Sequence, residues 1–179
     1  CVSSILASIN AVMAAGVVAL SGELHGGADE AAVMAAREAA SPENAKAFVS
    51  NLLARKGKLM GMGHREYKVV DPRALILKPM AESLCKGTPA ENLYETLQAL
   101  EIEFNAEMQA RGKDLWANVE YYKGAVFVAL GIPADNFTAL FAMARSVGWL
   151  AHFIEDRQDN RIFRPKAEYT GQQYRDLSA

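Results

Sequence analysis

The chain has 179 residues, of which 51% are hydrophobic and 22% are charged, and its formal net charge is -2. This composition is ordinary for a globular protein and excludes a disordered chain. The net charge does not indicate binding to nucleic acid or to an acidic membrane. The two cysteines, Cys1 and Cys85, have neither a disulfide framework nor a metal-binding spacing, so we expect a reducing, cytoplasmic compartment.

The first 22 residues carry no charge, and Val2–Leu20 is long enough to span a bilayer. The stretch is rich in Ala, Ser and Gly and contains Asn10, which favours a helix buried among other helices over a membrane span. The first residue is Cys, and no signal-like segment precedes it, so we interpret this terminus as a cut end.

Helix signals then dominate the chain. The first helix is expected to end near residue 22, and Asp29 is predicted to cap a second helix beginning at Glu30. Ser41-Pro42-Glu43 combines a capping residue with a proline in the first turn, which predicts a third helix to about residue 56.

The same signals recur in the second half of the chain. Asp71-Pro72 predicts a helix start, and Thr88-Pro89-Ala90-Glu91 is a capping box followed by apolar residues at helical spacing from Leu93 to Met108. Two more helices are expected over 121–130 and about 136–156, before a polar, extended tail. Strand patterns are weak, so the predicted fold class is all-α.

Two of the three histidines lie in glycine-rich loops between predicted helices. His25 lies within Gly22–Asp29, and His64 lies within Gly61–Arg65, upstream of Lys68 and Arg73. Glycines let the backbone approach a ligand closely, helix starts favour anions, and the nearby cations suit phosphates or carboxylates. One such histidine is usually only a turn residue, but two together favour a catalytic site. No second ligand has the spacing of a metal site.

These loops resemble the motifs of one enzyme family, the citrate synthases. The first loop is similar to the family's L-H-G-G-A motif, and the second to its G-x-G-H-R-x-Y-K block with the following D-P-R. Residues 118–124 resemble the family's N-V-D-F-Y-S-G segment. Further segments follow in the family's order, at Gly131-Ile132-Pro133, Phe137–Ala142 and Gly148–His152.

The resemblance implies an acyltransferase that condenses acetyl-CoA with oxaloacetate to citrate and CoA, as in the tricarboxylic acid cycle. It implies that His25 hydrogen-bonds the thioester oxygen as the enol forms, that Glu120 removes the methyl proton, and that His64 polarises the ketone. It further implies carboxylate binding by Arg73 and Arg157, whose planar fork suits that task. The residues implied to contact CoA are Gly61, Met62, Gly63 and Lys68.

Four departures from the family's motifs stand out. The family usually has Pro at Glu23, Asn at Asp29, a small apolar residue at Glu66 and Asp at Glu120. Asp29 is interpreted as a helix cap and Glu66 as facing solvent, whereas Glu23 can accept a hydrogen bond or raise the pKa of His25. The longer side chain at position 120 leaves other reactions open: 2-methylcitrate synthesis, citryl-CoA cleavage, or CoA binding without catalysis.

The resemblance also implies a domain layout and partners. Residues 1–24 are expected to belong to a truncated large domain, 25–131 to a small CoA-binding domain, and 132–179 to the large domain again. Acetyl-CoA and oxaloacetate are the expected ligands and a homodimer the expected assembly, with no tightly bound cofactor, metal, nucleic acid or membrane. We expect the chain alone to be inactive. His152, Trp116 and the pair Tyr121-Tyr122 are interpreted as core residues.

Overall fold

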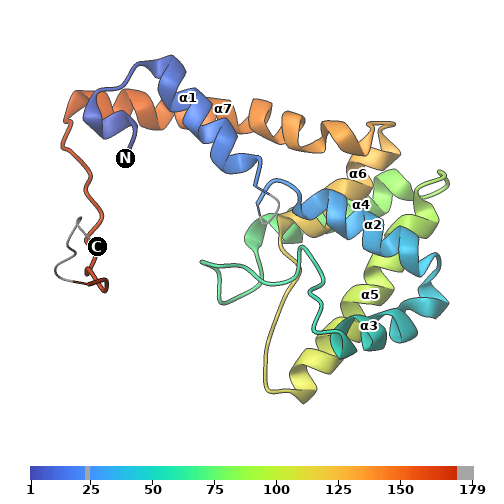
Figure 1. The fold of residues 1–179 in the computed structure, drawn as a ribbon. Coiled ribbons are helices and arrows are strands. Elements are labelled where there is room, and N and C mark those ends of the chain that lie inside the picture. Colours follow the sequence, from blue (N-terminus) through green and yellow to red (C-terminus); the bar gives the residue numbers. More distant parts are fainter. Residues whose placement is uncertain (23–24, 173–179) are drawn as a thin grey trace, which may run out of the picture. The chain divides into compact units, whose positions relative to one another are not determined.

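The computed structural model describes residues 1–22 and 25–172, and these form helices joined by loops (Figure 1). Within the described residues there is no strand, only one isolated antiparallel bridge between Met62 and Ala117. The predicted all-α class is confirmed.

The chain divides into two compact units. One unit comprises Cys1–Gly16 with the residues from Ser146 onward, and the other comprises Val17–Arg145. The first contains the short 3-10 helix η1 (Ser3–Ile5) and parts of α1 (Ile9–Leu20) and α7 (Phe137–Gln158). It is fastened by hydrogen bonds such as the one that the Asn160 amide donates to the Ser4 carbonyl at 3.0 Å.

The second unit holds most of the core. It contains α2 (Ala28–Ala39), α3 (Ala45–Ala54), α4 (Pro72–Cys85), α5 (Glu91–Ala110) and α6 (Val119–Ala129), with the 3-10 helices η2 (Pro42–Asn44) and η3 (Ala134–Asn136). Helix α6 packs against α2 and α4, and α5 packs against α2 and α3. The apolar stripe predicted for α5 is buried along its length, from Leu93 to Met108, because its helical spacing keeps it on one face.

Local capping explains several helix starts. Asp71 caps α4 by accepting the Arg73 N–H at 2.9 Å, as predicted. The capping box predicted at Thr88 was wrong: Thr88 accepts the Ala90 N–H at 3.1 Å, but Ala90 is the cap of α5 and makes no side-chain cap bond. The prediction for Asp29 was wrong: Gly27 is the cap of α2, and Asp29 lies inside its first turn. The helix begins two residues earlier than expected because Ala28 and Asp29 already have helical backbone.

Three tyrosines of α5 and α6 pack in the interior of this unit. The Tyr121 hydroxyl donates to the Leu97 carbonyl at 2.8 Å, and the Tyr122 hydroxyl donates to the Glu101 carboxylate. Both side chains are buried, which confirms their assignment to the core. Burial and nearby carboxylates raise the pKa of Tyr94 to about 12. Trp116 is only half-buried.

Two burial predictions were wrong. The stretch Val2–Leu20 is broken at Leu6, where φ is 62°, and α1 buries only Leu20. His152 was expected in the core, but 83% of its side chain is exposed and it pairs with Glu155 at 3.3 Å. Both errors have one cause: apolar composition predicts a face that needs a cover, and the contact of α7 with α1, where Trp149 lies against Gly16, buries only part of each helix.

By length and apolar composition alone, one described segment, Ala134–Gln158, is sufficient to cross a membrane.

Candidate functional site

The two histidine loops face a common cavity of about 490 Å³ in the second unit. His25 comes from the turn before α2, His64 from the loop before α4, and Glu120 from the first turn of α6. Arg73 and Gly63 also line it. The fold therefore brings together side chains from three regions of the sequence.

The glycine loop is fastened to the segment that precedes α6. The Gly63 N–H donates to the Trp116 carbonyl at 2.7 Å, and the Asn118 N–H donates to the Gly61 carbonyl at 2.8 Å. Gly61 has φ +82°, and a Cβ placed there would lie 2.9 Å from the Tyr121 Cα. Only glycine combines that backbone with such a close approach, so the loop lies directly on α6.

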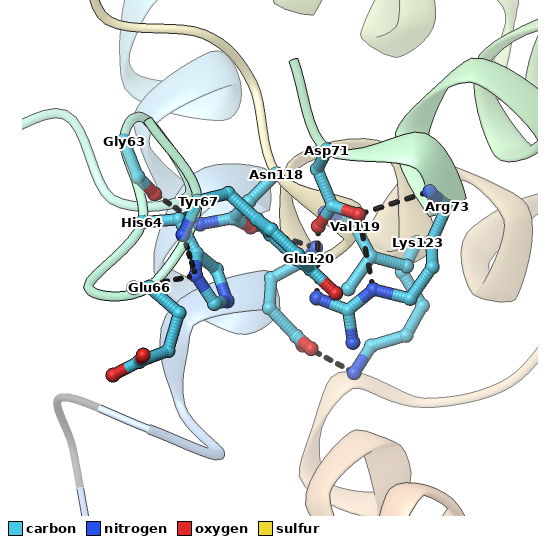
Figure 2. A network of polar contacts seen from close by, with 10 residues as sticks. All are labelled: Gly63, His64, Glu66, Tyr67, Asp71, Arg73, Asn118, Val119, Glu120 and Lys123. Carbon is cyan, nitrogen blue, oxygen red and sulfur yellow. Dashed lines mark hydrogen bonds and ion pairs between the residues drawn. The ribbon is translucent and has the colours of Figure 1, made fainter. Parts of the chain in front are cut away.

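His64 is oriented by its own loop (Figure 2). Its Nδ1 accepts the N–H groups of Glu66 at 3.1 Å and Tyr67 at 3.2 Å. Its ring lies against the Tyr67 ring, with centroids 4.5 Å apart. Because Nδ1 is the acceptor, the proton of the neutral ring is on Nε2. His64 is thus arranged to donate a hydrogen bond from Nε2.

Arg73 is held by the residue that caps its own helix. Asp71 accepts its Nε at 3.0 Å through one oxygen and its Nη2 at 2.8 Å through the other, and also accepts the Val119 N–H at 3.1 Å (Figure 2). Burial acts to raise the pKa of Asp71, but these hydrogen bonds and the guanidinium charge outweigh it and leave that pKa lowered. Asp71 uses one edge of the guanidinium, so Nη1 remains for a carboxylate ligand.

Glu120 is paired with a lysine that the sequence patterns did not indicate. Its carboxylate accepts a hydrogen bond from Lys123 Nζ, one turn further along α6 (Figure 2). The same ammonium lies 3.2 Å from Asp29 Oδ2 and 4.0 Å from the centre of the Phe141 ring. Asp29 is fully buried and Lys123 is 9% exposed. The two acidic residues that depart from the family's motifs, Asp29 and Glu120, therefore contact the same ammonium group.

Helix α7 contributes two further residues to the cavity, Phe141 and Arg145. The Phe141 ring meets His25 edge-on at 5.9 Å, and the Arg145 guanidinium lies 5.1 Å from the same ring. Phe141 already belonged to a matched segment, and Arg145 follows it by four residues. That spacing places both side chains on one helix face, so the sequence could have indicated Arg145 as a site residue.

The remaining acidic departures have different outcomes. Glu66 is exposed, as expected, although it also lines the cavity. Figure 2 shows its carboxylate directed away from the Asp71–Arg73 pair. Glu23 lies outside the described residues. The described residues contain no group of His, Cys, Asp and Glu that could hold a metal ion.

A second cavity, of about 560 Å³, adjoins the first at Ala28, Gly63 and Asn118. Gly61 and Met62 line it, together with four cations: Lys56, Lys58, Arg111 and Lys113. Lys68 lines another hollow, and its Nζ donates to the Arg65 carbonyl at 3.1 Å. The predicted CoA residues thus divide between two places.

Arg157 belongs to the other unit of the chain. Its guanidinium donates to the Ala7 carbonyl and lies 4.7 Å from the centre of the Phe153 ring. Its predicted role in binding a carboxylate stays a prediction.

Comparison with known proteins gives a consistent result. A family model described as citrate synthase, C-terminal domain, matches residues 1–166. The chain is 42% identical over 169 residues to the citrate synthase of Deinococcus radiodurans, a match covering 94% of this chain and 44% of that protein. The chain spans less than half the length of the curated relatives it matches.

Solved structures agree with the sequence relatives. The ternary complex of citrate synthase from Thermoplasma acidophilum with carboxymethyl coenzyme A and oxaloacetate matches with a TM-score of 0.86 and 36% identity, covering 99% of this chain and 48% of that one. A citryl-CoA lyase from Hydrogenobacter thermophilus matches with a TM-score of 0.77 and 30% identity, covering 98% and 69%.

Proposed function

The chain belongs to the citrate synthase family, and on that premise we propose that it supplies catalytic residues for condensing acetyl-CoA with oxaloacetate. The observation that carries the proposal is the single cavity lined by His25, His64, Arg73 and Glu120. The family match alone identifies ancestry, whereas this convergence provides a base, two hydrogen-bonding imidazoles and a carboxylate receptor in one place.

The first step is removal of a proton from the acetyl methyl group by Glu120. The C–H electrons form the enol double bond, and the thioester oxygen takes the developing negative charge. His25, which lines the same cavity, stabilises that oxygen by a hydrogen bond. This matters because a thioester methyl is a weak carbon acid and its enolate needs a preorganised partner.

The second step joins the two substrates. The enol carbon attacks the ketone carbon of oxaloacetate, and the ketone oxygen becomes a hydroxyl by taking a proton. His64 suits that task because its Nδ1 is occupied by backbone N–H groups and its Nε2 carries the proton. Arg73 binds a substrate carboxylate. Water then cleaves the citryl thioester to citrate and CoA.

The adjoining cavity is proposed as the receptor for CoA. Its four cations suit the phosphates of the nucleotide, and Gly61, Met62 and Gly63 provide backbone for close approach. It meets the first cavity at Gly63, so a thioester entering there reaches the catalytic side chains. Lys68 is retained as a proposed phosphate contact.

We also propose the wider setting of the chain. Residues 25–131 form the CoA-binding domain, flanked by large-domain segments at 1–24 and 132–179. The exposed apolar side chains of α7, such as Val147 and Ile154, support burial in a homodimer. Two unpaired cysteines support a cytoplasmic location.

A citryl-CoA lyase is the second candidate, and the match to the Hydrogenobacter lyase favours it. Its reaction cleaves citryl-CoA to acetyl-CoA and oxaloacetate, which is the reverse of the condensation and needs the same residues. The two candidates differ in whether the enzyme hydrolyses the thioester.

The test supplies the natural-length protein with acetyl-CoA and oxaloacetate and follows the products by mass spectrometry. Citrate and free CoA are expected, and E120Q is expected to abolish both. Cleavage of added citryl-CoA to acetyl-CoA without citrate release would identify a lyase. CoA binding without any turnover would contradict both candidates and indicate a non-catalytic relative. Propionyl-CoA, run in parallel, tests 2-methylcitrate synthesis.

A further inference from the structure

Three charged side chains form one cluster, and one of them, Glu120, lines the proposed catalytic cavity. Lys123 Nζ donates to the Glu120 carboxylate and lies 3.2 Å from Asp29 Oδ2. The cluster is shielded from water, since the exposed fractions of the Lys123, Glu120 and Asp29 side chains are 11%, 12% and 0%. A lysine this buried requires anionic partners, and it has two.

Each member of the cluster departs from the family motif. The family motifs that these segments resemble usually have Asn where this chain has Asp29 and Asp where it has Glu120, and the N-V-D-F-Y-S-G segment has Ser where it has Lys123. The added cation and the added anion cancel. The cluster therefore keeps the single negative charge of the motif's aspartate. In this chain that net charge is the sum over two carboxylates and one ammonium group.

Close packing of two helices makes the cluster possible. A Cβ at Gly124 would meet the Val33 side chain and lie 2.9 Å from the Asp29 carbonyl oxygen, so α6 and α2 touch at this point. Lys123 precedes Gly124 and follows Glu120 by three residues, which places both side chains on the same face of α6. The ammonium consequently reaches the base and the α2 carboxylate at once.

We propose that Lys123, anchored by Asp29, is a positioning residue for Glu120 in the condensation reaction. The inference rests on the proposed function. Glutamate has one more rotatable bond than aspartate, and without a partner its carboxylate populates several rotamers. The charge-assisted hydrogen bond fixes Oε2 and leaves Oε1 to meet the substrate.

The alternative is a purely structural ion pair that ties α2 to α6. A structural role predicts lost stability with unchanged catalysis in the molecules that fold. A positioning role predicts lost turnover in a protein that remains folded, and rescue when the shorter aspartate returns.

The experiment compares four variants of the natural-length protein. D29N/K123S removes both added charges, so neither the Lys123 ammonium nor the Asp29 carboxylate is left without the other. E120D is made in both the wild-type and the D29N/K123S background. K46S, which removes an exposed lysine on α3, is the control for loss of a positive charge. Thermal unfolding, kcat, KM for both substrates and exchange of acetyl-CoA methyl protons with D2O are measured for each.

D29N/K123S is expected to fold and to lose about 100-fold in kcat and in methyl exchange, with KM within about threefold of wild type. E120D is expected to lower kcat in the wild-type background and to raise it in D29N/K123S. Wild-type kcat in D29N/K123S, or the same effect of E120D in both backgrounds, overturns the positioning role. An inactive wild type instead refutes the proposed function, and the inference with it.

Discussion

Asn118 and Gly63 are joined by a 2.7 Å hydrogen bond, from the side-chain amide of the first to the carbonyl of the second. The other end of the same amide accepts the Glu120 N–H at 2.9 Å and caps α6. One side chain therefore links the loop that carries His64 to the helix that carries the proposed base. Substitution can remove the hydrogen bond to Gly63 alone, or both hydrogen bonds together.

N118D keeps the cap acceptor and places an oxygen against the Gly63 carbonyl, whereas N118A removes both hydrogen bonds. We expect both variants to lower kcat by on the order of 10- to 100-fold, because a shift of about 1 Å between His64 and Glu120 is costly. N118A should lose a further ~1 kcal/mol of stability with the cap. Steady-state kinetics and urea unfolding separate the two effects. Wild-type kcat in N118D would show that only the cap matters.

The sequence was most informative where structure is local. The cap at Asp71 and the apolar stripe from Leu93 to Met108 were predicted because each depends on residues within a few positions. The motif resemblance added what local patterns lack, namely that His25, His64 and Glu120 face one cavity.

Tertiary contacts set the limit of that prediction. The departures at Asp29 and Glu120 were visible, but their connection through Lys123 depends on how closely α2 and α6 approach at Gly124. The exposure of His152 was missed because apolar neighbours show that a face needs cover without showing what covers it.

Acid should weaken the Asp71–Arg73 pair. The pKa of Asp71 is lowered in the folded chain. Its contribution to the free energy of unfolding is therefore complete above the unfolded pKa of about 4 and is lost as pH falls through the folded pKa. The difference in unfolding free energy between wild type and D71N is expected to be about 2–3 kcal/mol at pH 7 and to shrink below about pH 4. Urea titrations from pH 3 to 7 measure it. A difference that is the same at every pH contradicts the assignment.

Alkali should destabilise the second unit through Tyr94. Its pKa is raised to about 12, so the folded chain keeps the phenol protonated where the unfolded chain ionises. The contribution of Tyr94 to the free energy of unfolding is complete below the unfolded pKa of about 10 and is lost as pH rises from there through the folded pKa. Y94F, which cannot ionise, should lose less stability than wild type between pH 9 and 11. Parallel loss in the two proteins would refute the assignment.

Phosphate binding by the second cavity is open to a direct test. K58A/K113A removes two of its cations, and we expect CoA binding to weaken about tenfold, or ~1.4 kcal/mol. Acetyl-pantetheine lacks the nucleotide phosphates and should bind both proteins equally. The control is K46A, which removes an exposed lysine outside both cavities. Isothermal titration calorimetry measures each affinity, and equal weakening for both ligands would argue against a phosphate contact.

Gly61 offers a test of how the loop lies on α6. G61A forces an alanine into φ +82° and drives its Cβ to 2.9 Å from the Tyr121 Cα, whereas G87A has φ +70° with no atom within 4 Å of its Cβ. The shared backbone strain costs each variant about 1–2 kcal/mol. Only G61A must also move the loop, so it alone should weaken CoA binding and lower kcat. Comparable kinetics in the two variants would mean that the loop tolerates displacement and that its contact with Tyr121 does not hold His64 in place.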